Sequence, residues 1–89
     1  MREEKKTEVV DALGLFPDVF LGDILVSVIG RRVVRVENYR SLILYTDTLV
    51  KIQAKTTKLL IHGRGLLVER YCEDEMTVCG AIQSLEFED

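Results

Sequence analysis

The side chains able to perform chemistry are few, and the strongest combination among them is His62 with Cys79. A histidine can activate a cysteine thiol as a nucleophile when the two lie within hydrogen-bond reach and a third group orients the base. Each of the two lies beside a glycine, Gly63 or Gly80, and the spacing marks out no third residue. A strand-end histidine and an ordinary thiol explain the pair more simply, so we expect no nucleophilic site here.

Two glutamates, Glu37 and Glu69, occupy equivalent places in a faint repeat, IGRRVVRVE at 29–37 and HGRGLLVE at 62–69. Paired carboxylates can act as general acid and base, but solvated strand ends hold glutamates more often. The acidic run CEDEM at 72–76 lacks the alternating ligands of a calcium loop. One histidine and two cysteines are too few for four zinc ligands of these types. We therefore expect no catalytic, metal or cofactor site, and a protein that is not an enzyme.

Size and composition are those of a small cytoplasmic domain. The 89 residues predict one domain over 1–89. The apolar stretch 24–30 is far shorter than the roughly 20 residues that span a bilayer, and residues 1–10 do not resemble a secretory signal. Cys72 and Cys79 are too few for a disulfide framework, which favours free thiols in a reducing compartment.

Residues 1–16 are expected to hold a short helix and a connector. The segment shows no strand-like alternation, and its apolar residues fall at helical spacing, namely Val9, Ala12, Leu13 and Phe16. Gly14 can end the helix in the left-handed conformation, and Pro17 prevents it from resuming. A helix this short is marginal alone, so we expect it to dock against the sheet or a partner.

From Ile24 onward, apolar and polar residues alternate with the period of a β-strand. The candidate strands are 24–29, 33–37, 41–45, 49–54, 57–62, 66–71, 76–79 and 82–87. The gaps are too short for parallel crossovers and require antiparallel hairpins. The structural turns are assigned to Gly30, Gly63 and Gly80. The predicted fold is mainly β: over 24–89, an antiparallel β-meander of about seven or eight short strands, curled into a roll or an open barrel or sandwich.

The alternation assigns one face to the core and leaves a second apolar set on the other. The expected inward residues are Val26, Val28, Val34, Val36, Leu42, Leu44, Val50, Ile52, Leu59, Ile61, Leu66 and Val68, joined by Val78, Leu85 and Phe87. The candidate interaction face consists of Ile29, Val33, Ile43, Tyr45, Leu49, Leu60, Leu67 and Tyr71. Curling of the sheet, the N-terminal helix or another chain could each cover this second set.

An uneven charge distribution supports a second hypothesis, a nucleic-acid or polyanion binder. Residues 48–68 carry four cations and no acid, whereas residues 69–89 carry seven acids and one arginine. The basic residues available for such binding are Arg31, Arg32, Arg35, Lys51, Lys55 and Lys58. Charge cancellation between neighbouring strands is the simpler explanation, so nucleic acid is the less favoured partner.

The order of these features resembles the YabP/YqfC family of sporulation proteins, and the YqfC branch in particular. The resemblance rests on Gly30, Glu37-Asn38, Tyr45-Thr46, Gly63 and Gly80, and covers nearly the whole chain after about residue 8. One departure is the turn AKTTK at 54–58, where family members often carry a glycine. The resemblance implies a role in endospore formation, in the mother-cell cytoplasm. Together with the second apolar face and the absence of catalytic groups, it favours a non-catalytic assembly or scaffold module.

The resemblance also implies a partner. Members of the YqfC branch are usually encoded beside a sporulation membrane protein, YqfD, so a YqfD-like protein is the expected partner and would hold the chain peripherally at a membrane. Self-association into a homo-oligomer is the other expectation. No small-molecule substrate, cofactor or transmembrane segment of the chain's own is expected, and no site residue is carried over from the family.

Overall fold

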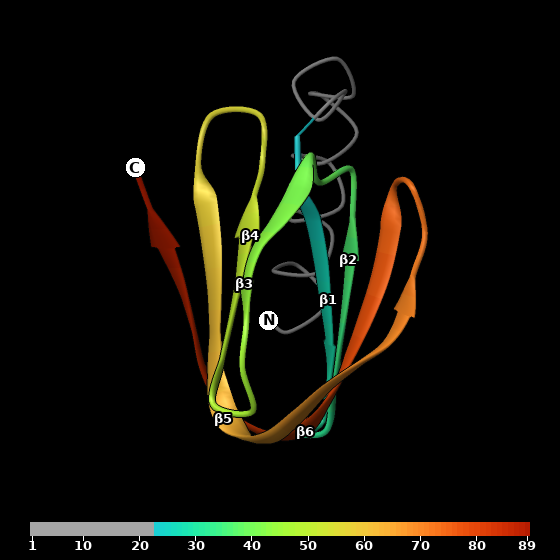
Figure 1. Cartoon of the computed structure of the whole chain (residues 1–89), viewed down its shortest axis with the longest axis vertical. Helices are drawn as coiled ribbons and strands as arrows, with labels where there is room; N and C mark the ends of the chain where they lie inside the picture. The colour runs from blue at the N-terminus through green and yellow to red at the C-terminus, as the bar shows by residue number, and fades with distance from the viewer. Residues whose placement is uncertain (1–22) are drawn as a thin grey trace, which may run out of the picture.

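The computed structural model describes residues 23–89, which form a single antiparallel sheet. Its strands are β1 (Leu25–Ile29), β2 (Val33–Glu37), β3 (Ser41–Tyr45), β4 (Leu49–Gln53), β5 (Lys58–Tyr71) and β6 (Glu75–Glu88). Their order is β1-β2-β6-β5-β4-β3, and the sheet does not close on itself (Figure 1). The mainly β, antiparallel prediction is confirmed over this range. The helix predicted within 1–16 lies outside the described residues.

Two long strands, β5 and β6, form the centre of the sheet. Each has 14 residues, and they pair with each other from Lys58↔Glu88 to Tyr71↔Met76. The ladder shifts register between Arg64 and Leu67, and here both strands bend so that the sheet folds over itself (Figure 1). Such bends let one sheet supply both sides of its own core.

The fold produces two layers. The β3 layer consists of β3, β4 and the parts of β5 and β6 that pair with each other at 58–63 and 82–88. The β1 layer consists of β1, β2 and the parts of β5 and β6 that pair at 66–71 and 76–79. Each layer therefore has four strand segments.

The structure corrects the predicted number of strands. Segments 57–62 and 66–71 belong to one strand, β5, and segments 76–79 and 82–87 belong to another, β6. Gly63 and Gly80 therefore mark bends within strands, whereas Gly30, with a φ of +57°, lies in the β1–β2 turn.

The reason is the close approach of two backbones at the bend. A Cβ on Gly63 would lie 2.3 Å from the carbonyl oxygen of Ala81, and one on Gly80 would lie 2.7 Å from that of Gly65. Glycine is needed here for space between strands, which a sequence cannot distinguish from the demands of a hairpin turn.

The meander is also wrong at one connection. β2 pairs with β6 and not with β3, so residues 38–40 cross from the β1 layer to the β3 layer. Asn38 adopts a φ of +63° at the start of this crossing, and its N–H donates to the carbonyl of Asp74 at 2.9 Å. The next residue, Tyr39, is only 5% exposed and joins the core. Short connections imply antiparallel neighbours only where consecutive strands stay in one layer.

The turns of the β1–β2 and β3–β4 hairpins provide hydrogen-bond acceptors for backbone groups at the bend. Peptide N–H groups that β5 and β6 present there donate to carbonyls of the β1–β2 and β3–β4 turns. These bonds are Gly80 to Arg32 (3.0 Å), Ile82 to Arg31 (2.8 Å), Gly63 to Thr48 (3.1 Å) and Leu66 to Asp47 (2.8 Å). The bend therefore needs both hairpins, because buried backbone donors must be paired.

The core lies between the two layers. Its fully buried side chains are Val34, Val36, Val50, Ile52, Leu59, Ile61, Met76 and Val78. All of these except Met76 belong to the predicted inward set, so strand alternation located most of the core correctly. Val26, Leu42, Val68 and Leu85 pack against it while remaining partly exposed.

The two sides of this sandwich differ. On one side the N–H of Val68 in the β1 layer donates to the hydroxyl of Tyr45 in the β3 layer at 3.0 Å. The opposite side lies between β1 and residues 82–88 of β6. There Val28 and Phe87 are 49% and 61% exposed, although each is paired with a buried core residue.

Candidate interaction surface

The predicted interaction face is divided between the two layers. Residues that alternate with core positions point away from the core. In a folded sheet, the outward sides of the two layers therefore lie on opposite sides of the molecule. Ile29, Val33 and Leu67 lie on the outer side of the β1 layer, whereas Leu49 and Leu60 lie on that of the β3 layer. The eight residues therefore do not form one surface.

The members in the β1 layer do form a continuous row, which we call the apolar stripe: Ile29, Val33, Cys79 and Leu67. The stripe takes one residue from each of β1, β2, β6 and β5, and its members are consecutive pairing partners: Ile29↔Val33, Val33↔Cys79 and Cys79↔Leu67. Ile29 is 58% exposed and Leu67 is 54% exposed. Because the row joins outward-facing apolar side chains of four neighbouring strands and is exposed at both ends, it is the candidate contact surface of this layer.

A shallow hollow of about 580 Å³ adjoins the stripe on the side of the bend. The stripe residues Val33 and Cys79 line it, together with Gly80 and the guanidinium-bearing Arg31 and Arg32. The stripe is therefore bordered by two cations of the β1–β2 turn. Such a border suits an apolar segment that carries a carboxylate.

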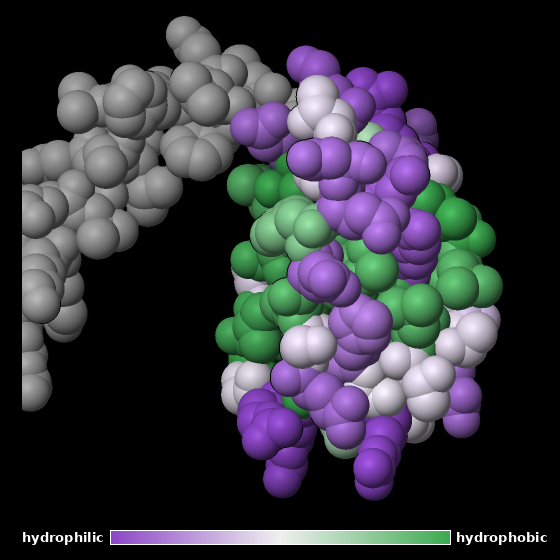
Figure 2. All heavy atoms as spheres, turned by 90° about the vertical axis from the view of Figure 1, so that its left-hand side faces the viewer, coloured by the Kyte–Doolittle hydropathy of each residue, from purple (hydrophilic) through white to green (hydrophobic). Residues whose placement is uncertain are grey.

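The outer side of the β3 layer is different in character, with a polar strip flanked by apolar surface (Figure 2). Lys51 Nζ lies 3.1 Å from Glu88 Oε1, and His62 Nε2 lies 3.2 Å from Glu86 Oε1. Leu60 pairs with both Lys51 and Glu86 and is only 8% exposed. Because Leu60 is nearly buried, it offers little contact surface.

Ile43 and Leu44 are exposed at the edge of the β3 layer, at 46% and 42%. The β3–β4 register shifts between Leu42 and Leu44, so that Leu44 pairs with the outward-facing Lys51. This bulge corrects the inward assignment of Leu44, because one extra residue moves the following side chain to the other face.

The two tyrosines of the predicted face have structural contacts. Tyr45 joins the layers through Val68, as described above. Tyr71 stacks on Tyr39 with ring centroids 5.9 Å apart and an interplanar angle of 24°. The hydroxyl of Tyr39 donates to the carbonyl of Cys72. Burial, followed by the nearby Tyr71, raises the pKa of Tyr39 to about 12, so this hydroxyl stays protonated under ordinary conditions.

The residues considered for catalysis are not brought together. His62 is held by Glu86 in the β3 layer, whereas the thiol of Cys79 donates to Glu69 Oε2 at 2.6 Å on the outside of the β1 layer. The carboxylate of Glu69 and partial burial raise the pKa of the Cys79 thiol, which reduces its thiolate fraction. Glu37 lies elsewhere, opposite Glu75 in the β2–β6 ladder.

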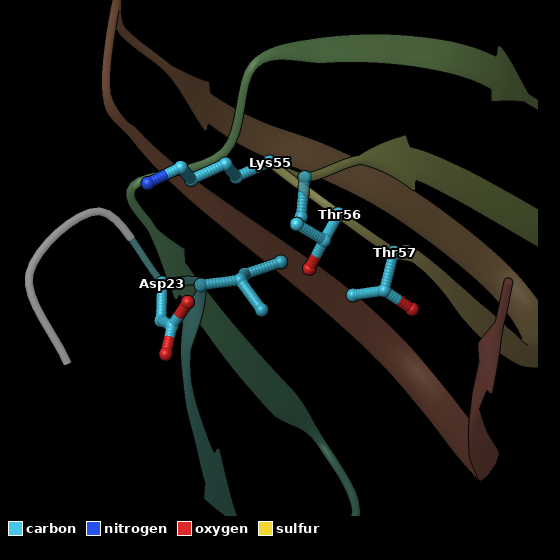
Figure 3. Close-up of a pocket in the computed structure, with 6 residues that line it drawn as sticks. Asp23, Lys55, Thr56 and Thr57 are labelled. Atoms are coloured by element: carbon cyan, nitrogen blue, oxygen red, sulfur yellow. The ribbon is translucent and has the colours of Figure 1, made fainter. Parts of the chain in front are cut away.

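A pocket of about 280 Å³ opens at the end of the sandwich opposite the bend. Figure 3 shows it between the start of β1, at Asp23, and the β4–β5 turn, from which Lys55, Thr56 and Thr57 project. Asp23 and Lys55 lie on one side of the pocket and the threonine hydroxyls on the other (Figure 3). Its lining supplies two opposite charges and two hydroxyls, without a buried polar group aimed inward among residues 23–89.

The basic residues do not share one face. Arg31 and Arg32 lie in the turn beside the bend, whereas Lys55 lies in the β4–β5 turn. Arg35 is 3.6 Å from Glu75, and Lys51 is paired with Glu88. Within residues 23–89, Lys51 is the one cation of the segment 48–68 that forms an ion pair, and Lys58 lies opposite Glu88 in the β5–β6 ladder. Neighbouring strands therefore cancel part of the sequence's uneven charge.

Residues 23–89 contain no helix of the length and hydropathy that a membrane span requires. Within the same residues, no group of three or more histidine, cysteine or acidic side chains is placed to hold a metal ion. Cys72 and Cys79 are free thiols.

Comparison with known proteins gives one family match: the model of the YabP family matches residues 22–89. The chain belongs to the YabP family. A relative named uncharacterized protein YqfC, from Bacillus subtilis (strain 168), is 23% identical over 86 residues, which cover 97% of this chain and 92% of the relative. No solved structure matches.

The family assignment confirms the resemblance found in the sequence. The YabP match covers all six strands and the three glycines on which the resemblance partly rests, Gly30, Gly63 and Gly80. Two features of the surface were not foreseen, the inclusion of Cys79 in the stripe and the two arginines at its border. Because Cys79 follows the inward-facing Val78 in a strand, alternation already indicated that Cys79 faces outward. Connecting Cys79 to Val33 also required knowing that β2 pairs with β6.

Proposed function

We propose that this protein is a non-catalytic assembly module of endospore formation that docks onto a sporulation membrane protein through the apolar stripe. The observation that carries the proposal is the continuous row Ile29, Val33, Cys79 and Leu67, exposed at both ends and built from all four strands of one layer. Membership of the YabP family supports the sporulation context, and a YqfD-like protein is the proposed partner, with the mother-cell cytoplasm as the compartment.

The stripe favours an apolar partner segment with an acidic neighbour. Full burial of an aliphatic side chain contributes about 1.5–3 kcal/mol, and Ile29 and Leu67 each leave more than half of their surface available. Arg31 and Arg32 border the adjoining hollow, so a carboxylate on the partner would meet positive charge. This mode of binding uses side chains of a rigid sheet and needs no change in the fold.

The placement of the side chains also supports a non-catalytic role. The only histidine is paired with Glu86 in one layer, and Cys79 is paired with Glu69 in the other. The thiol's raised pKa disfavours the nucleophilic form. We therefore assign Cys79 to the docking surface.

The experiment is capture of the soluble portion of the YqfD-like protein by the tagged 89-residue chain. Leu67→Glu places a charge at the stripe, and Leu44→Glu is the matched control, because Leu44 is also an exposed leucine on an outward face but lies in the other layer. We expect Leu67→Glu to abolish capture and Leu44→Glu to retain it. Equal capture by both variants, or no capture by the unsubstituted chain, would contradict the proposal.

A further inference from the structure

The folded sheet of residues 23–89 has four outer strand edges, and they differ in how well they could receive another strand. An unpaired edge presents backbone N–H and C=O groups that another chain can bond. β3 is interrupted by the bulge before Leu44. Residues 66–71 of β5 contain a register shift and two charged side chains, and residues 82–88 of β6 contain two glutamates. Bulges and charges of this kind discourage strand addition.

β1 has none of these features. Its five residues, Leu25–Ile29, pair with β2 without a register shift, and they include no charged residue and no proline. Leu25, Val28 and Ile29 are 40%, 49% and 58% exposed. β1 is therefore the regular, uncharged and apolar edge of the described sheet.

The backbone of β1 presents its free groups at defined residues. In an antiparallel ladder, successive residues direct their N–H and C=O alternately toward one neighbour and the other. The carbonyl of Ile29 accepts from the N–H of Arg32 at 3.3 Å, so Ile29 faces the β2 side. By alternation Ser27 and Leu25 also face β2, and Val26 and Val28 direct their backbone groups to the open edge.

The sequence of β1 is nearly symmetric about Ser27. In LVSVI, Val26 and Val28 are equidistant from Ser27, and so are Leu25 and Ile29. An antiparallel pair of β1 strands centred on Ser27 would place Val26 opposite the partner's Val28 and Leu25 opposite the partner's Ile29. Each side chain would then meet an apolar one of similar size on the same face of the sheet, and the open groups of Val26 and Val28 would bond each other.

The symmetry also selects the register. The paired segment ends with β1, because the chain turns at Gly30 directly after Ile29. Shifting the register by one residue would oppose inward and outward side chains, and shifting it by two would place Leu25 or Ile29 opposite the partner's Ser27.

We infer that β1 is the self-association site of this protein: two copies pair their β1 strands antiparallel about Ser27 and form one eight-stranded layer across a two-fold axis. Such an isologous contact uses the same patch on both copies and closes after two. One strand pair is smaller than a standard interface of about 800 Å² per partner, so the dimer is weak and its population depends on concentration. This inference deepens the proposed function by naming a second copy as one partner, and Leu67 remains free for the membrane protein.

The test uses two exposed serines on outer strands, Ser27 at the centre of β1 and Ser41 at the start of β3. In the full chain with Cys72→Ser and Cys79→Ser, Ser27→Cys would place two thiols at a non-hydrogen-bonded pair, where Cα atoms are about 4.5 Å apart and a disulfide is feasible. We expect Ser27→Cys to give a covalent dimer under mild oxidation and Ser41→Cys to stay monomeric. No dimer from Ser27→Cys, or an equal yield from Ser41→Cys, would overturn the inference.

Sedimentation of the unsubstituted chain provides a second measurement that does not depend on the cysteine variants. We expect its mass to rise with concentration toward twice that of the chain. Val28→Pro should lose the dimer, because proline removes an N–H that Val28 directs to the open edge and not to β2. A strictly monomeric unsubstituted chain, or a Val28→Pro variant that still dimerises, would overturn the inference. Capture of the YqfD-like protein by Val28→Pro would show that the proposed function stands separately.

Discussion

The backbone N–H of Val68, on β5, donates a hydrogen bond to the hydroxyl of Tyr45, on β3, at 3.0 Å. The two residues belong to opposite layers of the folded sheet, and Val68 immediately precedes a register shift in the β5–β6 ladder. Tyr45 thus supplies a partner to a backbone group on the free edge of the β1 layer. This single side chain joins the two layers along one side of the sandwich.

Removing that hydroxyl should weaken the fold by a measurable amount. Tyr45→Phe keeps the ring and deletes the acceptor, and the expected loss is about 1 kcal/mol in the free energy of unfolding, the usual value for one such hydrogen bond. Urea denaturation measures it. Tyr71→Phe is the control, because it preserves the ring that stacks on Tyr39. Equal denaturation midpoints for the two variants would show that the bond between layers contributes nothing.

Two glycines at the bend should respond differently to the same substitution. Gly65 has a φ of +59° and no heavy atom within 4 Å of a built Cβ, so Gly65→Ala should cost about 1–2 kcal/mol from backbone strain alone. In Gly63→Ala the new Cβ would lie 2.3 Å from the backbone carbonyl oxygen of Ala81. Because a backbone atom cannot move aside cheaply, we expect Gly63→Ala to cost more than about 3 kcal/mol.

Thermal unfolding followed by circular dichroism would compare the two alanine variants with the unsubstituted chain. The prediction requires the order of melting temperatures to be unsubstituted, Gly65→Ala, Gly63→Ala. If Gly63→Ala proved as stable as Gly65→Ala, the close approach of β5 and β6 at the bend would be wrong, and Gly63 would act as an ordinary turn residue.

How much of this fold can be predicted from the sequence depends on how far apart in the sequence the interacting residues lie. Alternation is a local property, and it correctly placed Val34, Ile52 and Ile61 in the core. It failed at Leu44, because a β-bulge moves the following side chain to the opposite face of the sheet, and the composition does not indicate a bulge. It also failed at Phe87, whose position in the ladder faces inward but whose ring is 61% exposed at the open side of the sandwich.

The candidate surface shows the same limit. The alternation within each strand was enough to predict that Ile29, Val33 and Leu67 face outward. That they lie in one continuous stripe with Cys79 depends on the pairing of β6 with both β2 and β5. That pairing joins segments more than forty residues apart in the sequence for Val33 and Cys79, and hairpin turn signals contain no information about it. Tyr39 was likewise missed because it lies in a connection and not in a strand.

The titration of Tyr39 provides a prediction for alkaline pH. Its pKa is raised to about 12, mainly by burial, whereas in the unfolded chain a tyrosine titrates near 10. Both states are neutral below that range, so Tyr39 adds no pH dependence there. As the pH rises from about 10 to about 12 the unfolded state loses its proton first, and stability should fall. Tyr39→Phe should remove this decline.

Spectrophotometric titration of the folded chain would test this assignment, since it has three tyrosines. The most alkaline of the tyrosinate steps should disappear in Tyr39→Phe and persist in Tyr45→Phe. A titration in which Tyr39→Phe instead removes the step at lowest pH would contradict the burial of this hydroxyl and its bond to the carbonyl of Cys72.

The final prediction concerns the thiol of Cys79, which donates to Glu69 Oε2 at 2.6 Å. This hydrogen bond, together with partial burial and the charge of Glu69, raises the pKa of the thiol, and only the thiolate reacts rapidly with an alkylating reagent. Glu69→Gln removes the charge and should lower the pKa, so alkylation at mildly alkaline pH should become faster. In a Cys72→Ser background, mass spectrometry would follow Cys79 alone.

Glu86→Gln is the matched control for this measurement, because Glu86 contacts His62 in the opposite layer and should leave the alkylation rate of Cys79 unchanged. An unchanged or slower rate in Glu69→Gln would mean that the carboxylate does not hold the thiol in its protonated form. Cys79 would then be a more reactive member of the stripe than its contacts indicate, because the restraint on the thiolate would be absent. The same assay reports on docking, since a partner bound over the stripe would shield Cys79 from the reagent.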